Sequence, residues 1–205
     1  METVKLGALE CGVAGSALAG QAESGDHHVV CHFPDGILTA VLDGLGHGDN
    51  AAAAARKAVR ILEENSREPV IALVRRCHEQ LRATRGVVMS VASFAVPYGL
   101  MTWIGVGNVQ GLLRRFGTQG FGSQEMLLLR GGVVGIHLPP LAAAILPVFP
   151  GDILILATDG IRGDFAEGPL EADTPQEMAE NLLSRFRKAS DDALVLVAKF
   201  LGNRA

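Results

Sequence analysis

A long uncharged stretch, residues 86–113, constrains the fold of this chain more than any other feature. Its length alone would suit a membrane-spanning helix. Turn-forming residues interrupt it, however, with Pro97-Tyr98-Gly99 at its centre and Gly107-Asn108 further on. They divide the stretch into pieces of strand length, and a strand that is covered on both faces is apolar throughout. We therefore expect strands buried between layers of structure, and no membrane span.

The rest of the chain also alternates apolar strands with amphipathic helices. Strands are predicted at residues 37–42, 87–96, 100–106, 109–116, 126–130, 142–149, 152–157 and 193–200. Helical spacing of apolar residues predicts helices over 50–64, capped by Asp49 or Asn50, and over 69–82, begun by Pro69. A capping box at Thr174-Pro175-Gln176-Glu177 predicts a last helix. Runs of strands broken by helices favour an α+β layered fold, with helices outside the sheets, over a βαβ sheet.

Size and charge limit the possible functions. With 205 residues, the chain is expected to form one domain over residues 1–205. The net charge is −4 and the basic residues are scattered, which argues against a nucleic-acid partner. Two basic pairs, Arg75-Arg76 and Arg114-Arg115, are expected on solvated faces.

Cysteine usage and the N-terminus bear on the compartment. The chain has Cys11, Cys31 and Cys77, an odd number with no CxxC spacing. A disulfide scaffold or zinc knuckle is therefore not expected, and a reducing compartment fits. The N-terminal residues lack the charged-then-apolar pattern of a signal peptide. We expect a cytoplasmic protein.

Aspartates stand at strand ends or tight turns in several places. Val41-Leu42-Asp43-Gly44 and Ala157-Thr158-Asp159-Gly160 share one pattern, an apolar strand followed by Asp and Gly. Asp26 and the pair Asp191-Asp192 also adjoin apolar strands. Hard divalent cations prefer several such oxygens, and two cations about 3.5–4 Å apart can share a carboxylate and a water molecule and lower the pKa of that water. Asp-Gly is also an ordinary turn signal, so the residues alone leave both interpretations open.

Other residues favour structural roles. His27, His28 and His32 are close in sequence, but adjacent histidines in a strand point to opposite faces, so they are not expected to share a metal. Trp103 is expected in the core. The glycines from Gly105 to Gly111 lack the spacing of a dinucleotide-binding fingerprint.

The short motifs that contain these aspartates occur in a familiar order. They are Ser24-Gly25-Asp26 and residues 41–48 (VLDGLGHG), 85–90 (RGVVMS), 106–109 (VGNV), 158–161 (TDGI) and 191–193 (DDA). Together they resemble the metal-dependent serine/threonine protein phosphatase (PPM) family, and within it the short SpoIIE-like bacterial branch. The chain length and the Asp-Gly-Leu-Gly loop are most similar to the stressosome phosphatases of that branch. The resemblance spans Asp26 to Asp192 and implies a four-layer αββα sandwich, with two antiparallel sheets face to face.

The resemblance also implies roles for individual residues. Asp43 would bridge two metals and the Gly44 carbonyl would ligate one of them. Asp159 and Asp191 would complete the other site, while Asp26 would hold a metal-bound water. Asp26 and Asp43 are thus the implied catalytic residues, Asp192 has an implied supporting role, and the implied cofactor is one or two Mn²⁺ or Mg²⁺ ions. The implied substrate is a phosphorylated stress-signalling protein, a stressosome protein of the anti-sigma-factor-antagonist type.

Several positions depart from the family pattern. Gln21 stands about where larger members carry an arginine that grips phosphate. Leu45 replaces the histidine that many members have directly after Asp-Gly, and His47 is a possible substitute general acid, although a role as a surface loop residue suits it better. Gly25 replaces an acidic residue. The missing arginine and Gly25 favour one alternative, a signalling or binding module with weak or no catalysis. A phosphatase for small molecules is a third hypothesis, which a comparison of a phosphoserine protein with free phosphate esters would distinguish.

Overall fold

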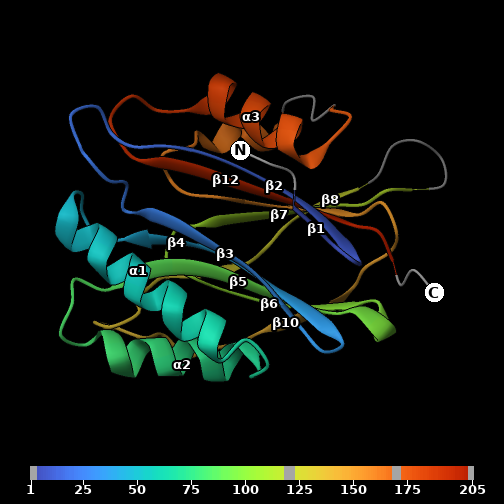
Figure 1. Ribbon diagram of the computed structural model, residues 1–205, viewed down its shortest axis with the longest axis horizontal. Coiled ribbons are helices and arrows are strands. Elements are labelled where there is room, and N and C mark those ends of the chain that lie inside the picture. Colours follow the sequence, from blue (N-terminus) through green and yellow to red (C-terminus); the bar gives the residue numbers. More distant parts are fainter. Residues whose placement is uncertain (1–3, 118–122, 168–171, 203–205) are drawn as a thin grey trace.

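The computed structural model describes residues 4–117, 123–167 and 172–202. Two sheets form the centre of the described chain (Figure 1). The first has the strand order β1 (Val4–Leu6), β2 (Leu9–Ser16), β12 (Ala193–Phe200), β11 (Ile153–Ala157), β7 (Gln110–Arg114) and β8 (Gln124–Met126). The second has the order β10 (Ala144–Pro147), β6 (Leu100–Val106), β5 (Val87–Ala95), β4 (Gly36–Gly44) and β3 (Asp26–Phe33). Neighbours in both of these orders are antiparallel, and β9 (Leu129–Arg130) runs parallel to β6.

Helices cover the outer faces of the two sheets (Figure 1). α1 (Asp49–Glu64) and α2 (Val70–Leu81) lie on the second sheet, and α3 (Pro175–Phe186) lies on the first. Short 3₁₀ turns occupy η1 (Val96–Tyr98) and η2 (Gly163–Glu167). The predicted αββα sandwich is confirmed. No helix in the described ranges is both long and apolar enough to span a membrane.

Three apolar layers hold the sandwich together, and β4 shows how one strand serves two of them. Ile37 and Val41 belong to the layer between the sheets. Leu38, Ala40 and Leu42 belong to the layer under α1 and α2. Because side chains alternate along a strand, both faces of β4 are apolar, which explains the continuous run in the sequence. The same alternation directs the next residue, Asp43, toward the space between the sheets.

The predicted strand over residues 126–130 is wrong. β8 pairs with β7 in the first sheet, whereas β9 pairs with β6 in the second. Between them the side chain of Leu127 enters the layer between the sheets, and its N–H donates to the carbonyl of Gly111. A Cβ at Gly111 would lie 2.9 Å from Leu127 Cδ1. The chain crosses from one sheet to the other here because Gly111 leaves room for Leu127.

The ends of the other elements differ only locally from the prediction. α1 begins at Asp49 with Gly48 as its N-cap residue and no side-chain cap, so the predicted cap at Asp49 or Asn50 is wrong. The capping box of α3 is present, with Thr174 accepting from the Glu177 N–H and Glu177 accepting from the Thr174 N–H.

Strands β1, β2 and β3 were not among the predicted elements. Trp103 is buried in the core, as predicted.

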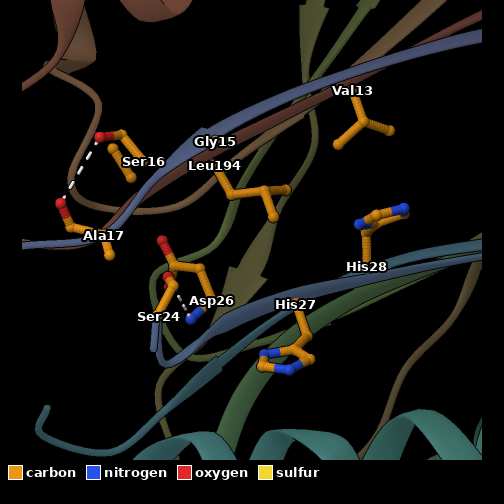
Figure 2. Close-up of a pocket in the computed structure, with 10 residues that line it drawn as sticks. Val13, Gly15, Ser16, Ala17, Ser24, Asp26, His27, His28 and Leu194 are labelled. Carbon is orange, nitrogen blue, oxygen red and sulfur yellow. Dashed lines mark hydrogen bonds between the residues drawn. The ribbon is translucent and has the colours of Figure 1, made fainter. Parts of the chain in front are cut away.

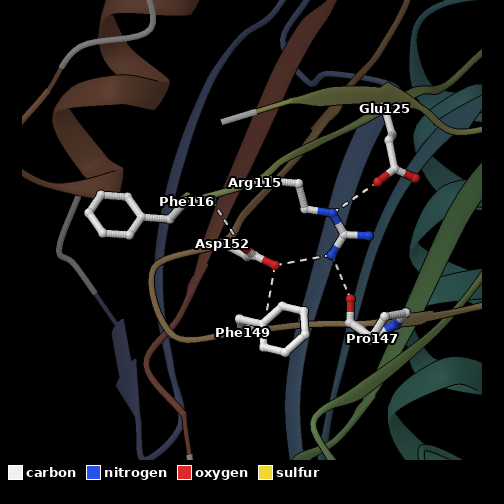
Figure 3. A network of polar contacts seen from close by, with 6 residues as sticks. All are labelled: Arg115, Phe116, Glu125, Pro147, Phe149 and Asp152. Carbon is white, nitrogen blue, oxygen red and sulfur yellow. Dashed lines mark hydrogen bonds and ion pairs between the residues drawn. The ribbon is translucent and has the colours of Figure 1, made fainter. Parts of the chain in front are cut away.

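A buried ion pair closes the sandwich at the β7–β10 side (Figure 3). Arg115, only 17% exposed, donates to Asp152 Oδ2 at 3.1 Å, to the Pro147 carbonyl at 2.5 Å and to Glu125 at 2.9 Å. Asp152, 2% exposed, also accepts from the backbone N–H groups of Phe116 and Phe149. The expectation that Arg115 lies on a solvated face is therefore wrong, because its sequence neighbours do not show that it joins the two sheets.

Candidate metal centre

Asp26 and Asp43 lie side by side at one end of the second sheet. They face each other across the β3–β4 ladder. The adjacent pair is hydrogen-bonded, with the Gly44 N–H donating to the Gly25 carbonyl at 3.1 Å. Because hydrogen-bonded and non-hydrogen-bonded pairs alternate, Asp26 and Asp43 form a non-hydrogen-bonded pair, the kind whose side chains are closer. The ladder therefore places two carboxylates together.

The first sheet supplies the other acidic residues at the same end. β11 and β12 are antiparallel, with Ala157 opposite Val195, so Asp159 after β11 and Asp191 before β12 are neighbours. Thr158 connects the two sheets, since its hydroxyl donates to Asp26 Oδ2 at 2.7 Å. Carboxylates from four strand ends thus gather where the layer between the sheets reaches the surface.

Asp192 has a different environment from the other aspartates. It is 4% exposed and accepts from the backbone N–H of Leu18 at 2.6 Å and from that of Gly25 at 2.7 Å. Both oxygens are therefore used to hold the loop that leads into Asp26. Asp192 thus differs from Asp43, because backbone N–H groups already donate to both of its carboxylate oxygens.

The carbonyl of Gly44 is left without its ladder partner. In a regular ladder the Gly25 N–H would donate to it, but that N–H donates to Asp192 instead. The packing also requires glycine here, because a Cβ at Gly44 would lie 2.1 Å from the Ala51 carbonyl oxygen. A buried carbonyl oxygen without a donor is costly unless another partner binds it, and a divalent cation is one such partner.

Burial and mutual repulsion raise the pKa values of the central carboxylates. Burial, followed by the charges of Asp26, Asp159 and neighbouring aspartates, raises the pKa of Asp43 to about 8. Burial also raises the pKa of Asp26 to about 7, although the Thr158 hydrogen bond opposes that shift. The pKa of Asp159 is raised by burial and by Asp191. The protein alone thus leaves these negative charges uncompensated, as expected for residues that meet a cation.

The oxygen atoms of these residues are of the kind that binds a divalent ion, but their positions do not form a complete metal site. Among the described residues, no three His, Cys, Asp or Glu side chains already form a group that could hold a metal. The oxygens are nevertheless hard, anionic and close to one another, and Asp43 accepts no hydrogen bond from the described residues. A divalent ion would offset their charge and polarise a water molecule. Asp43, Gly44, Asp159 and Asp191 are the residues able to hold it.

His27 and His28 follow Asp26 directly along β3. Figure 2 shows His27 and His28 on opposite sides of β3, as the alternation of side chains predicts. His27, His28 and Asp26 all line a cavity of about 360 Å³ between β2 and β3, which is otherwise bordered largely by apolar groups. His47 is exposed on the loop after Gly44, and the structure gives it no polar partner among the described residues. It is not brought into the cluster.

Sequence reasoning did not assign roles to some residues that shape the centre. Asn108 Nδ2 donates to Asp159 Oδ2 at 2.7 Å, and Lys188 Nζ donates to the Asp159 carbonyl at 2.5 Å. Asn108 stands at a strand end in one of the short motifs, which was a usable signal. Lys188 lies in the approach to β12 without any motif, and only its contact across the chain reveals it.

Comparison with known proteins gives a consistent result. The family model described as stage II sporulation protein E (SpoIIE) matches residues 34–201. No curated protein matches the chain by sequence. One similar structure, solved in work on the bacterial stressosome as a modular system adapted to control secondary messenger signalling, has a TM-score of 0.82 and 27% identity, covering 93% of this chain and 99% of that one.

Two further structures share the fold at lower identity. RsbX in complex with magnesium has a TM-score of 0.86 and 20% identity, over 97% of this chain and 98% of that one. The PP2C phosphatase domain of SpoIIE from Bacillus subtilis, solved with a fragment of its regulatory domain, has a TM-score of 0.80 and 20% identity, over 96% of this chain and 64% of that one. With a family match over most of its length, this chain belongs to the SpoIIE family of PP2C-type protein phosphatases.

Proposed function

We propose that this protein is a Mn²⁺- or Mg²⁺-dependent phosphatase that removes phosphate from serine or threonine of a stress-signalling protein of the anti-sigma-factor-antagonist type. The observation that carries the proposal is the meeting of uncompensated carboxylates from both sheets beside the free Gly44 carbonyl. The similarity to RsbX with magnesium and to the stressosome structure supports the metal and the class of partner.

Each residue has a distinct part in this proposal. Asp43, the Gly44 carbonyl, Asp159 and Asp191 would hold the ions, which would polarise the attacking water and offset the charge of the phosphate. Thr158 orients the Asp26 carboxylate by its hydrogen bond, so that Asp26 can accept a proton or a hydrogen bond from the water that attacks phosphorus. Asp192 holds Gly25, and through it the entry to β3, in place.

The proposal treats residues 1–205 as one phosphatase domain that acts in the cytoplasm. β2 from the start of the described chain and β12 from its end pair directly in the first sheet. Cys11, Cys31 and Cys77 are all free thiols, which suits a reducing compartment.

Removal of metal is expected to stop the reaction. The purified protein, treated with a chelator, should release no phosphate from a phosphorylated antagonist protein, and added Mn²⁺ or Mg²⁺ should restore release. Without a cation the clustered carboxylates repel both the dianionic phosphate and one another. Phosphate release is measured against metal concentration, with free phosphate esters as the comparison substrate. Turnover that persists in chelator contradicts the metal requirement, and preference for the free esters contradicts the protein substrate.

A signalling module with weak or no catalysis is the second candidate. It is favoured by Gly25, which stands where an acidic residue would add a ligand, and by the absence of a ready-made three-residue metal group among the described residues. Binding of a partner phosphoprotein without metal-dependent turnover would support this candidate over the enzyme.

A further inference from the structure

Arg85 occupies a turn that hydrogen bonds hold firmly. After α2 ends at Leu81, the Thr84 N–H and hydroxyl both donate to the Leu81 carbonyl, at 2.8 and 2.7 Å. The Gly86 N–H donates to Thr84 Oγ1 at 3.1 Å. Gly86 has a φ of +76°, and a Cβ there would lie 2.8 Å from the Val134 carbonyl oxygen. The backbone on both sides of Arg85 is thus fixed.

This turn is tied to the loop that follows Asp43. The Leu45 N–H donates to the Gly86 carbonyl at 3.1 Å, and Gly44 lies opposite Val87 in the β4–β5 ladder. The same register places Gly46 opposite Arg85. The side chain of Arg85 also lies against Gly46, because a Cβ at Gly46 would lie 2.7 Å from Arg85 Nη1. The guanidinium therefore rests against the loop that begins at the Asp43–Gly44 pair.

The guanidinium of Arg85 makes no hydrogen bond or ion pair with any residue in the described ranges. Other arginines are committed: Arg56 to Glu23, Arg76 to Glu68 and Arg115 to Asp152. Arg85 is exposed and has its donors available. Gln21, whose side chain lies over Gly48 of the same loop, is a neutral amide.

We propose that Arg85 binds the phosphate group of the phosphorylated substrate on the Gly46 side of the aspartate centre. A phosphate monoester carries two negative charges into a cluster of carboxylates, so positive charge from the protein is favourable there. Guanidinium donates two parallel hydrogen bonds to phosphate oxygens and stays charged at every physiological pH. This inference rests on the proposed phosphatase function, and it adds a residue in contact with substrate.

Substitution of Arg85 tests the inference. Arg85→Ala should raise KM for the phosphoprotein and the inhibition constant of inorganic phosphate together, each by about 10- to 100-fold, with kcat changed much less. Such a pattern indicates an interaction made equally in the bound and transition states. Arg85→Lys should recover part of the lost affinity, since lysine restores the positive charge but not the two parallel hydrogen bonds of the guanidinium. The melting temperature should stay unchanged, which separates binding from a structural role.

Arg82→Ala is the matched control, because it removes an exposed arginine from the same helix end with the same change in net charge. It should leave both constants within about twofold of the wild type. If Arg85→Ala behaves like this control, the inference is overturned.

A calorimetric titration with inorganic phosphate, in the presence of Mg²⁺ or Mn²⁺, keeps this inference separate from the proposed function. If the wild-type protein has no turnover, the proposed function fails on its own. Phosphate binding that is lost in Arg85→Ala and kept in Arg82→Ala still supports the anion site, whereas equal phosphate binding by all three proteins refutes it.

Discussion

Replacement of Asp43 by asparagine is expected to abolish phosphate release, with a loss of about 10³-fold or more in kcat. Asp43 lies opposite Asp26 in the β3–β4 ladder, and its pKa is raised by the charges of Asp26, Asp159 and Asp191, so it is the carboxylate that a bound ion would most affect. Asparagine keeps the shape but removes the anionic ligand, and a neutral amide binds hard cations weakly. Phosphate release from the phosphoprotein at saturating Mn²⁺ is the measurement.

The same substitution should not weaken the metal-free fold. The Asp43 carboxylate is largely buried beside other aspartates and accepts no hydrogen bond from the described residues, so its charge opposes folding. Without metal, the melting temperature of Asp43→Asn should equal or exceed that of the wild type. Added metal should stabilise the wild type and leave the variant unchanged.

Asp35→Asn provides the control for this experiment. Asp35 is exposed in the turn at the far end of the β3–β4 pair, with a φ of +64°, which asparagine also tolerates. It should retain full activity and full stabilisation by metal. An active Asp43→Asn protein would refute the proposed mechanism, as would an equal response of the two variants to metal.

Local patterns were enough to predict the part of the fold that carries Asp43. The apolar run of β4, its end at Asp-Gly and the Ala-rich α1 after it are all short-range features, and the structure reproduces them. Strands that are apolar on both faces predicted a layered α+β fold with helices outside the sheets, and the family resemblance implied the αββα order of layers that the structure has. The resemblance to the phosphatase family then joined Asp26, Asp159 and Asp191 to the same centre.

Long-range contacts could not be predicted in this way. Asp192 was expected to support the centre, and its bond to the Gly25 N–H takes that donor from the Gly44 carbonyl. No spacing in the sequence indicates that the Gly25 N–H donates to Asp192 rather than to Gly44, because Gly25 and Asp192 are far apart along the chain. The crossing at Leu127 and the burial of Arg115 also depend on partners in the opposite sheet.

β11 has a carboxylate near each end, and the two have opposite environments. Asp152, before the strand, accepts from one guanidinium and two backbone N–H groups. Asp159, after it, accepts from Asn108, but burial and Asp191 still raise its pKa. The charge of Asp152 therefore has partners and stabilises one end of the sandwich. At the other end the charges of Asp159 and its neighbouring aspartates lack enough partners, and there a cation and substrate are expected to bind.

Asp152→Ala is accordingly expected to cost stability rather than chemistry. It leaves the guanidinium of Arg115 and the N–H groups of Phe116 and Phe149 without their buried acceptor. Removal of one partner of a buried ion pair costs about 3–5 kcal/mol. For a chain of this size, that loss lowers the melting temperature by about 10 °C. Thermal and urea unfolding of the metal-free protein measure it.

Asp164→Ala is the control that shows how much of the effect comes from burial of the ion pair. Asp164 also pairs with an arginine, Arg162, but both side chains are about half exposed, at 55% for Asp164 and 48% for Arg162. Its loss should cost no more than about 1 kcal/mol, since water screens and replaces the ion pair. Folded Asp152→Ala protein should keep the metal dependence of the wild type, because Asp152 lies a full strand length from Asp159. Equal destabilisation by the two substitutions would show that the Arg115 network does not hold the sheets together.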